Sequence, residues 1–225
     1  LKITDRCNMH CGHCFLDCGS DGDDMDMSTF NKFLEFAEYI RDLAGKPQSI
    51  VVSGGEPTVN RNFRDIVTAL DDLAYNHSFI KHTLVYTNGK RVDDTLFLIE
   101  LAKRSSMLDV GLSLDEWHEP ISDRVLNEYF AARAMHSNLM ISGVKFMLNR
   151  GRALQNGLPG FDICPTPALF IGPTGQIYEC GCQVRSFGSV FYSDTTALAD
   201  YYARRKALGT KRICSRGKAL PLQQG

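Results

Sequence analysis

The stretch Cys7-Asn8-Met9-His10-Cys11-Gly12-His13-Cys14 decides how this chain is interpreted. It follows a short β-like segment, Leu1-Lys2-Ile3-Thr4, and places three thiols at positions i, i+4 and i+7. Three thiolates can hold three corners of a [4Fe–4S] cubane, which leaves one iron without a protein ligand. Such an open position distinguishes a catalytic metal centre from a closed structural one. Spacing alone leaves a second interpretation open, a zinc ion with His10 or His13 as fourth ligand.

The eight cysteines of the 225 residues fall into two groups separated by a long cysteine-free stretch. The first group is Cys7, Cys11, Cys14 and Cys18, and the second is Cys164, Cys180, Cys182 and Cys214. A chain of this length builds its own hydrophobic core, so it does not need disulfides to fold. The grouping therefore predicts two metal sites and a reducing, cytoplasmic location.

Charge and hydropathy exclude several functions. The chain has 25 Lys and Arg against 26 Asp and Glu, and this balance provides no general attraction to nucleic acid or to an anionic membrane. No apolar run approaches the roughly 20 residues of a spanning helix, so we expect no membrane segment. Because the sequence starts at Leu1 and not at a methionine, we expect it to be cut from a longer chain.

Beyond the cysteines, β-like runs alternate with helical patterns, which is typical of parallel strands joined by helices. After the segment 1–4, we predict strands at 49–52, 83–86, 108–113 and 144–148. Helices are predicted over 28–43 (capped by Ser28), 63–73, 93–104 and 125–130.

The pattern changes after Gly151, where glycine and proline become frequent. The runs 168–171 and 176–178 flank Gly172-Pro173-Thr174-Gly175, which predicts a β-hairpin. We therefore divide the chain into residues 1–155 and 156–225. The fold class is α/β, with a small C-terminal hairpin and helix extension.

Five motifs resemble, in order, those of the radical S-adenosylmethionine (SAM) superfamily. Each follows a predicted strand, and the carboxyl ends of parallel strands meet at one mouth. The motifs are Cys7-x3-Cys11-x2-Cys14, Gly54-Gly55-Glu56-Pro57, Thr87-Asn88-Gly89, Ser113 with Asp115, and Asn149-Arg150.

The resemblance implies a partial (β/α)5–6 barrel in which Cys7, Cys11 and Cys14 hold a [4Fe–4S] cluster. It also implies that an electron from an external flavodoxin- or ferredoxin-type reductant cleaves SAM to a 5′-deoxyadenosyl radical, which abstracts a hydrogen atom from the substrate. Other implied contacts to SAM come from Gly54, Gly55, Glu56 and Pro57 (amino group), Asn88 (ribose), Ser113 and Asp115 (sugar and sulfonium), and Asn149 (carboxylate or ribose). His13 stands where many members carry an aromatic ring that stacks.

The second cysteine group resembles the start of a SPASM or Twitch extension. Four remaining cysteines match the shorter form, with one auxiliary [4Fe–4S] cluster on Cys164, Cys180, Cys182 and Cys214. Cys182 lies so close to Cys180 that it either ligates the cluster or stays free, and a structural zinc ribbon is the alternative. The resemblance leaves open whether 168–171 is a sixth barrel strand.

The sequence leaves three candidate functions. The first is radical SAM chemistry on a ribosomally made peptide, and the second is the same chemistry on a small metabolite, such as an aminosugar epimerase or dehydrogenase. The third, from another class, is a non-enzymatic protein with two zinc sites. Cys18 is a plain buried thiol or, as in radical epimerases of this family, a hydrogen-atom donor. Trp117-His118-Glu119 faces substrate or packs in the core.

Overall fold

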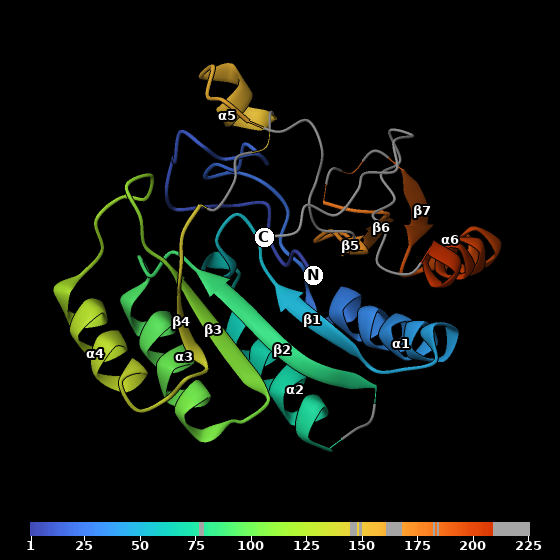
Figure 1. Ribbon diagram of the computed structural model, residues 1–225, viewed down its shortest axis with the longest axis horizontal. Helices are drawn as coiled ribbons and strands as arrows, with labels where there is room; N and C mark the ends of the chain where they lie inside the picture. Colours follow the sequence, from blue (N-terminus) through green and yellow to red (C-terminus); the bar gives the residue numbers. More distant parts are fainter. Residues whose placement is uncertain are drawn as a thin grey trace.

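The computed structural model describes residues 1–76, 79–144, 148, 150–160, 168–181, 183 and 185–208, with side chains as far as Arg204 (Figure 1). Four predicted site residues lie outside this described part, namely Asn149, Cys164, Cys182 and Cys214. Within it, no helix has both the length and the apolar character needed to cross a membrane.

The centre of the molecule is a parallel sheet of four strands in the order β1-β2-β3-β4. The strands are β1 (Gln48–Val52), β2 (Ile80–Thr87), β3 (Leu108–Ser113) and β4 (Leu139–Ser142). Three helices cross between successive strands, α2 (Phe63–Asn76), α3 (Val92–Arg104) and α4 (Asp123–Arg133), and Figure 1 shows them side by side along the sheet. The predicted α/β class is confirmed, and this sheet is consistent with a partial barrel.

The predicted first strand is reduced to a single bridge beside β1. Lys2 pairs with Ser53 in parallel, and the Ser53 N–H donates to the Leu1 carbonyl at 2.8 Å. On its other side the Lys2 N–H donates to the Ile171 carbonyl at 2.8 Å. The N-terminal segment therefore joins the parallel sheet to the C-terminal region.

Strand β4 was not predicted, and the strand predicted at 144–148 falls mostly on residues 145–147, which lie outside the described part. Asn138 lies directly before β4, and its side-chain amide donates to the carbonyls of Ala102, Ser105 and Leu108, at 2.8, 3.2 and 2.8 Å. These bonds fix the turn after α4, and the chain enters the sheet at the next residue.

Helix α1 (Met27–Ala44) packs its apolar side into the core through Phe30, Phe33, Phe36 and Ile40. Its N-cap is Asp26 rather than the predicted Ser28, because the Asp26 carboxylate accepts the Thr29 N–H at 2.7 Å. Gly45 ends the helix at φ 69°, a left-handed conformation that favours glycine.

The C-terminal region is a second, antiparallel sheet in the order β5-β6-β7-β8. Its elements are β5 (Phe170–Ile171), β6 (Gln176–Tyr178), β7 (Ser186–Ser189), β8 (Tyr192–Ser193) and α6 (Thr195–Leu208). The predicted hairpin is confirmed, since Phe170 pairs with Tyr178. A sixth barrel strand at 168–171 is wrong, because β5 pairs antiparallel with β6. Helix α6 contacts α1, and its Leu198 and Tyr201 complete the core.

Candidate active site

The predicted motifs converge on one cavity of about 220 Å³ at the carboxyl ends of the parallel strands. In Figure 1 the blue N-terminal loop lies beyond the arrowheads of β1 and β2, with the short helix α5 (Gly151–Gln155) above it. The cavity is lined by the predicted residues Cys7, Cys11, His13, Cys14, Cys18, Gly54, Gly55, Glu56, Pro57, Asn88 and Ser113. Segments from four separate parts of the sequence thus share one space.

The Gly54–Pro57 turn packs directly against the cysteine loop. The Gly55 N–H donates to the Thr4 carbonyl and the Glu56 N–H to the Arg6 carbonyl, both at 2.9 Å. A Cβ on Gly55 would lie 2.3 Å from the Arg6 carbonyl oxygen and 2.9 Å from the Cys7 Cβ. Only glycine permits this approach, so the turn and the loop form one unit.

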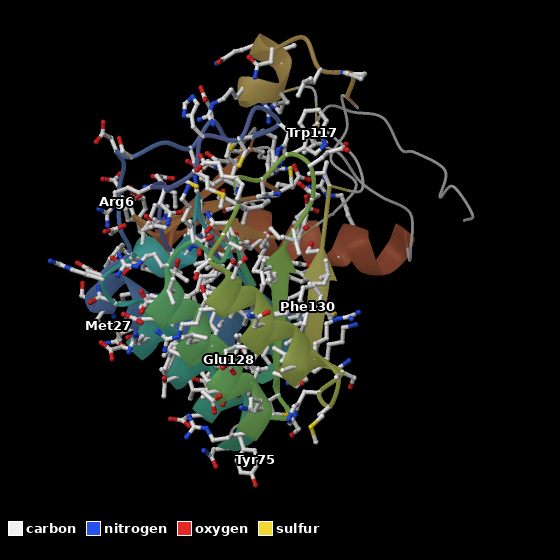
Figure 2. All side chains as sticks on the ribbon, turned by 90° about the vertical axis from the view of Figure 1, so that its left-hand side faces the viewer. Arg6, Met27, Tyr75, Trp117, Glu128 and Phe130 are labelled. Carbon is white, nitrogen blue, oxygen red and sulfur yellow. The ribbon has the colours of Figure 1, made fainter. Side chains whose placement is uncertain are left out.

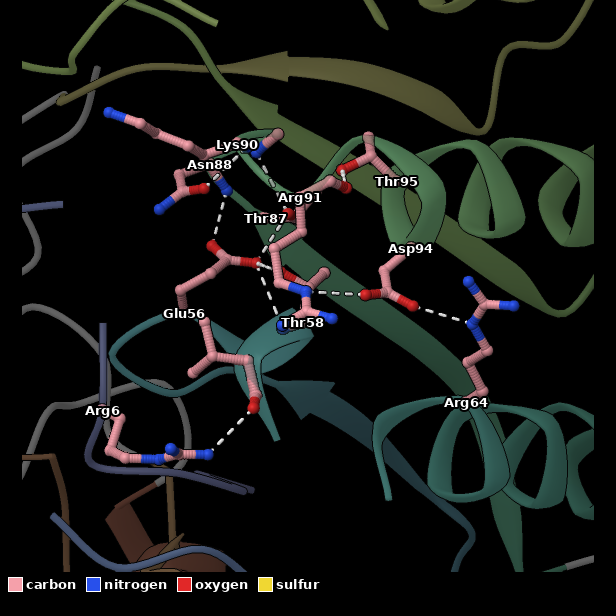
Figure 3. A network of polar contacts seen from close by, with 12 residues as sticks. Arg6, Glu56, Thr58, Arg64, Thr87, Asn88, Lys90, Arg91, Asp94 and Thr95 are labelled. Atoms are coloured by element: carbon pink, nitrogen blue, oxygen red, sulfur yellow. Dashed lines mark hydrogen bonds and ion pairs between the residues drawn. The ribbon is translucent and has the colours of Figure 1, made fainter. Parts of the chain in front are cut away.

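Glu56 ties this turn to the motif after β2, as Figure 3 shows. Its Oε1 accepts from the hydroxyls of Thr58 (2.6 Å) and Thr87 (2.7 Å), and its Oε2 accepts the Asn88 N–H at 2.7 Å. Burial raises the pKa of Glu56 above its ordinary value, against the lowering effect of these bonds. The carboxylate is thus occupied within the protein, and it holds two motifs together.

Asn88 lies between β2 and the cysteine loop. Its side-chain nitrogen donates to Asn8 Oδ1 at 2.9 Å and lies 3.9 Å from the Cys7 sulfur. Its side-chain oxygen accepts the Lys90 N–H at 3.0 Å. These bonds hold the amide, which is 6% exposed, at the cavity wall.

Asp115 does not line the cavity; it supports a residue that does. Its Oδ1 lies 2.7 Å from His118 Nδ1, and its Oδ2 accepts the Val144 N–H at 2.8 Å. Partial burial raises the pKa of Asp115, but the bonds from His118 and from the backbone outweigh it, and the pKa is lowered. His118 is the residue of this pair that reaches the cavity.

His13 sits edge-on to two rings, with centroids 5.0 Å from His118 and 6.0 Å from Trp117. Figure 2 places Trp117 at the same end of the molecule as α5, opposite Tyr75. The His13 Nδ1 is buried and has no hydrogen-bond partner among the described residues. Burial and the neighbouring His118 lower the pKa of His13, which favours a neutral ring with a polar atom available to a ligand.

The four N-terminal thiols differ in their environments, and none is in a disulfide. Burial raises the pKa of Cys7 to about 11 and also raises that of Cys11. A hydrogen bond from the Cys18 thiol lowers the pKa of Cys14 to about 5 and raises that of Cys18. Cys18 is 5% exposed and lies against Cys14.

These residues fit an iron–sulfur cluster with SAM better than a zinc ion. Zinc needs its thiolates within about 2.3 Å of one point. Across the described ranges, no three His, Cys, Asp or Glu side chains converge closely enough to hold a single metal ion. The thiols of Cys7, Cys11 and Cys14 instead line a cavity. That cavity also contains a glycine turn without Cβ atoms and the free nitrogen of His13.

The cavity is also lined by His118 and Arg152, which were not predicted as site residues. Trp117-His118-Glu119 was noted as a segment that faces substrate or packs in the core, and His118 does line the cavity. Arg152 belongs to α5, which is far from the cysteines in sequence.

Comparison with known proteins identifies the class. The family model described as "Radical SAM superfamily" matches residues 1–142, and the chain belongs to this superfamily. SAM and one [4Fe–4S] cluster are therefore supported as its cofactors, and the chain is a radical SAM enzyme.

Individual relatives match over part of their length. The GTP 3′,8-cyclase of Synechocystis sp. is 29% identical over 116 residues, which cover 51% of this chain and 32% of that protein. The tungsten-containing aldehyde ferredoxin oxidoreductase cofactor-modifying protein of Pyrococcus furiosus is 35% identical over 114 residues, covering 50% of this chain and 28% of that protein. The matched region thus spans about a third of these relatives.

One solved structure, described as native anSMEcpe with bound AdoMet, superposes with a TM-score of 0.57. It covers 93% of this chain and 82% of that one at 16% identity. At this identity the similarity establishes the fold alone, and it extends through the C-terminal region.

Proposed function

We propose that Cys7, Cys11 and Cys14 hold the [4Fe–4S] cluster and that SAM lies across the same cavity. When bound and reduced, this pair supplies a 5′-deoxyadenosyl radical that takes a hydrogen atom from an unactivated C–H bond of the substrate. The observation that carries the proposal is the single cavity shared by the three thiols and by the predicted SAM motifs. The chain's part is to orient SAM and to exclude water.

Each wall of the cavity has a proposed role. The backbone of Gly54 and Gly55 receives the methionine amino group, because Glu56 is occupied and serves with Pro57 to shape the turn. Asn88 and Ser113 face the ribose. His13 stacks or hydrogen-bonds, and Asp115 acts through His118. Asn149, outside the described residues, stays a proposed carboxylate or ribose contact.

We propose that residues 1–155 form the radical SAM barrel and that 156–225 form an extension with one auxiliary [4Fe–4S] cluster on Cys164, Cys180, Cys182 and Cys214. Support comes from Cys180, which is buried two residues after the end of β6. An external flavodoxin- or ferredoxin-type protein supplies the electron.

For the substrate we propose a ribosomally made peptide, on the analogy of the C-terminal extension. The relative from Synechocystis favours the second candidate, a small metabolite, because it is named as a GTP cyclase. Cys18 is our proposed hydrogen-atom donor, since it is buried and lines the cavity. Cys18→Ala then forms 5′-deoxyadenosine but fails to complete the product, and unchanged product would exclude this role.

The experiment is anaerobic reconstitution with iron and sulfide, followed by reduction in the presence of SAM. We expect a brown protein with about eight iron per chain that forms 5′-deoxyadenosine. The matched control is Cys14→Ala, which should form none. A colourless wild-type protein with about two zinc per chain would instead support the zinc protein.

A further inference from the structure

Helix α5 lies on the cysteine loop although almost the whole barrel sequence separates them. Arg152 is 6% exposed, and its two terminal nitrogens donate to the carbonyls of Cys11 (3.0 Å) and Cys18 (2.6 Å). Its own backbone N–H donates to the Cys14 carbonyl at 2.9 Å. A single residue therefore holds the loop at three of its four cysteines.

Asp17 completes the arrangement. Its Oδ1 lies 3.1 Å from Arg152 Nε, and its Oδ2 accepts from the Gln155 amide at 3.1 Å. Asp17 has φ 54°, a left-handed conformation that Asp and Asn tolerate better than most residues. The ion pair thus anchors the strained end of the loop.

The rest of α5 fits the loop closely. Gly151 has φ 53°, and a Cβ there would lie 2.6 Å from the Phe15 carbonyl oxygen and 2.7 Å from that of Cys14. Asn156, the residue after the helix, donates from its side chain to the Gly12 carbonyl at 3.0 Å. Contacts therefore run along the whole segment from Cys11 to Cys18.

The arrangement also places the positive charge of Arg152 at the cavity wall. A guanidinium keeps its positive charge at every physiological pH. Arg152 lines the same cavity as Cys7, Cys11 and Cys14, and its paired carboxylate, on Asp17, is partly exposed to solvent. Buried charges are screened much less than exposed ones. A cluster held by the three thiols would gain negative charge on reduction, which a nearby buried cation favours.

We propose that Arg152 is a positioning residue that fixes the cysteine loop and raises the reduction potential of the cluster held there. The inference rests on the proposed function, because it needs the cluster on Cys7, Cys11 and Cys14. It concerns residues that act on the cluster from outside its ligand set.

The test measures the midpoint potential of the N-terminal cluster by EPR redox titration at pH 7. The reconstituted protein carries Cys164→Ala, Cys180→Ala, Cys182→Ala and Cys214→Ala, which removes all proposed ligands of the second cluster. Arg152→Met should lower the equilibrium constant for reduction about tenfold, or about 59 mV for one electron. It should also speed iron loss to a chelator. Arg152→Lys keeps the positive charge but lacks the planar guanidinium that donates to two carbonyls. It should therefore keep the wild-type potential but still lose iron faster than the wild type.

Two further variants separate charge from loosening. Asp17→Asn removes the negative partner while tolerating the same φ, so it should raise the potential, opposite to Arg152→Met. The matched control is Arg64→Met, which removes a guanidinium paired with Asp94 at 2.7 Å on α2. It should leave the potential unchanged.

The inference is overturned if the midpoint potential of Arg152→Met is the same as that of Arg64→Met. It is also overturned if Asp17→Asn lowers the midpoint potential, as Arg152→Met does. Should Arg152→Met not fold, the direction of the Asp17→Asn shift decides. A wild-type chain that binds no cluster would overturn the proposed function and this inference with it, whereas an unchanged potential in Arg152→Met overturns this inference alone.

Discussion

The two cysteine regions are built in different ways. The N-terminal loop is held by α5 and by the segments that follow β1 and β2, because a parallel sheet brings the ends of distant strands to one edge. Cys180 instead follows a hairpin of two- and three-residue strands, so its position depends on local antiparallel pairing. A site assembled from distant strands should be sensitive to changes in many places, and a locally built site to few.

Cysteine substitutions should separate the two regions most strongly. We expect a triple Cys7→Ala, Cys11→Ala, Cys14→Ala variant to lose all SAM cleavage and to keep about four iron per chain. A quadruple Cys164→Ala, Cys180→Ala, Cys182→Ala, Cys214→Ala variant should also keep about four iron per chain but still cleave SAM. Iron analysis and 5′-deoxyadenosine formation check both, and equal loss of cleavage in the two variants would contradict independent sites.

A smaller change in the backbone should test how the first site is assembled. Gly55→Ala puts a methyl group 2.3 Å from the Arg6 carbonyl oxygen, so the turn and the loop must separate. We expect a loss of about 1–3 kcal/mol in the free energy of unfolding and weaker SAM binding. Gly19→Ala is the matched control, because a Cβ there meets no atom within 4 Å. Chemical denaturation and SAM titration check the prediction. Equal stability and equal SAM affinity in Gly55→Ala and Gly19→Ala would contradict the close packing of the turn against the loop.

The second region offers a corresponding change. Gly188 in β7 has φ 96°, and a Cβ there would lie 2.5 Å from the Tyr192 carbonyl oxygen. Gly188→Ala should cost about 1–3 kcal/mol through backbone strain in the antiparallel sheet. Because this sheet is built locally, we expect 5′-deoxyadenosine formation to persist. Loss of that activity in a folded variant would show that the regions are coupled.

The smallest expected effect is at α1, which contacts both regions. Asp26→Ala removes the N-cap bond to Thr29 and should cost about 1 kcal/mol in thermal or chemical unfolding. Hydrogen bonds from the Thr29 backbone and side chain lower the pKa of Asp26. The cap's stabilisation is therefore present above the unfolded pKa of about 4 and is lost as the pH falls through the folded value. If the difference in the free energy of unfolding between wild type and Asp26→Ala grew as the pH fell, the prediction would be contradicted.

Much of the fold was predictable because its signals are local. Helix α3 was predicted at 93–104 and is observed at Val92–Arg104, and the Gly172–Gly175 turn predicted its hairpin. Strand β4 was not predicted, because its start depends on Asn138, whose bonds reach three carbonyls on distant segments. Sequence periodicity cannot reveal such bonds.

For the site as well, the sequence predicted local motifs but not contacts between distant segments. The cysteine spacing and the glycine turn identified one cavity, since each motif carries its own chemistry. Asp115 was expected to face SAM, yet its oxygens are used by His118 and by backbone N–H groups. Arg152 was not predicted as a site residue, because its role comes from where α5 is placed by the fold.

The most direct measurement is the EPR spectrum, recorded with and without SAM, of the reduced protein in which Cys164, Cys180, Cys182 and Cys214 are all replaced by Ala. The account predicts that SAM changes the cluster signal, because the iron left without a protein ligand takes the methionine group. A spectrum unaltered by saturating SAM would contradict a vacant iron beside the Gly54–Pro57 turn.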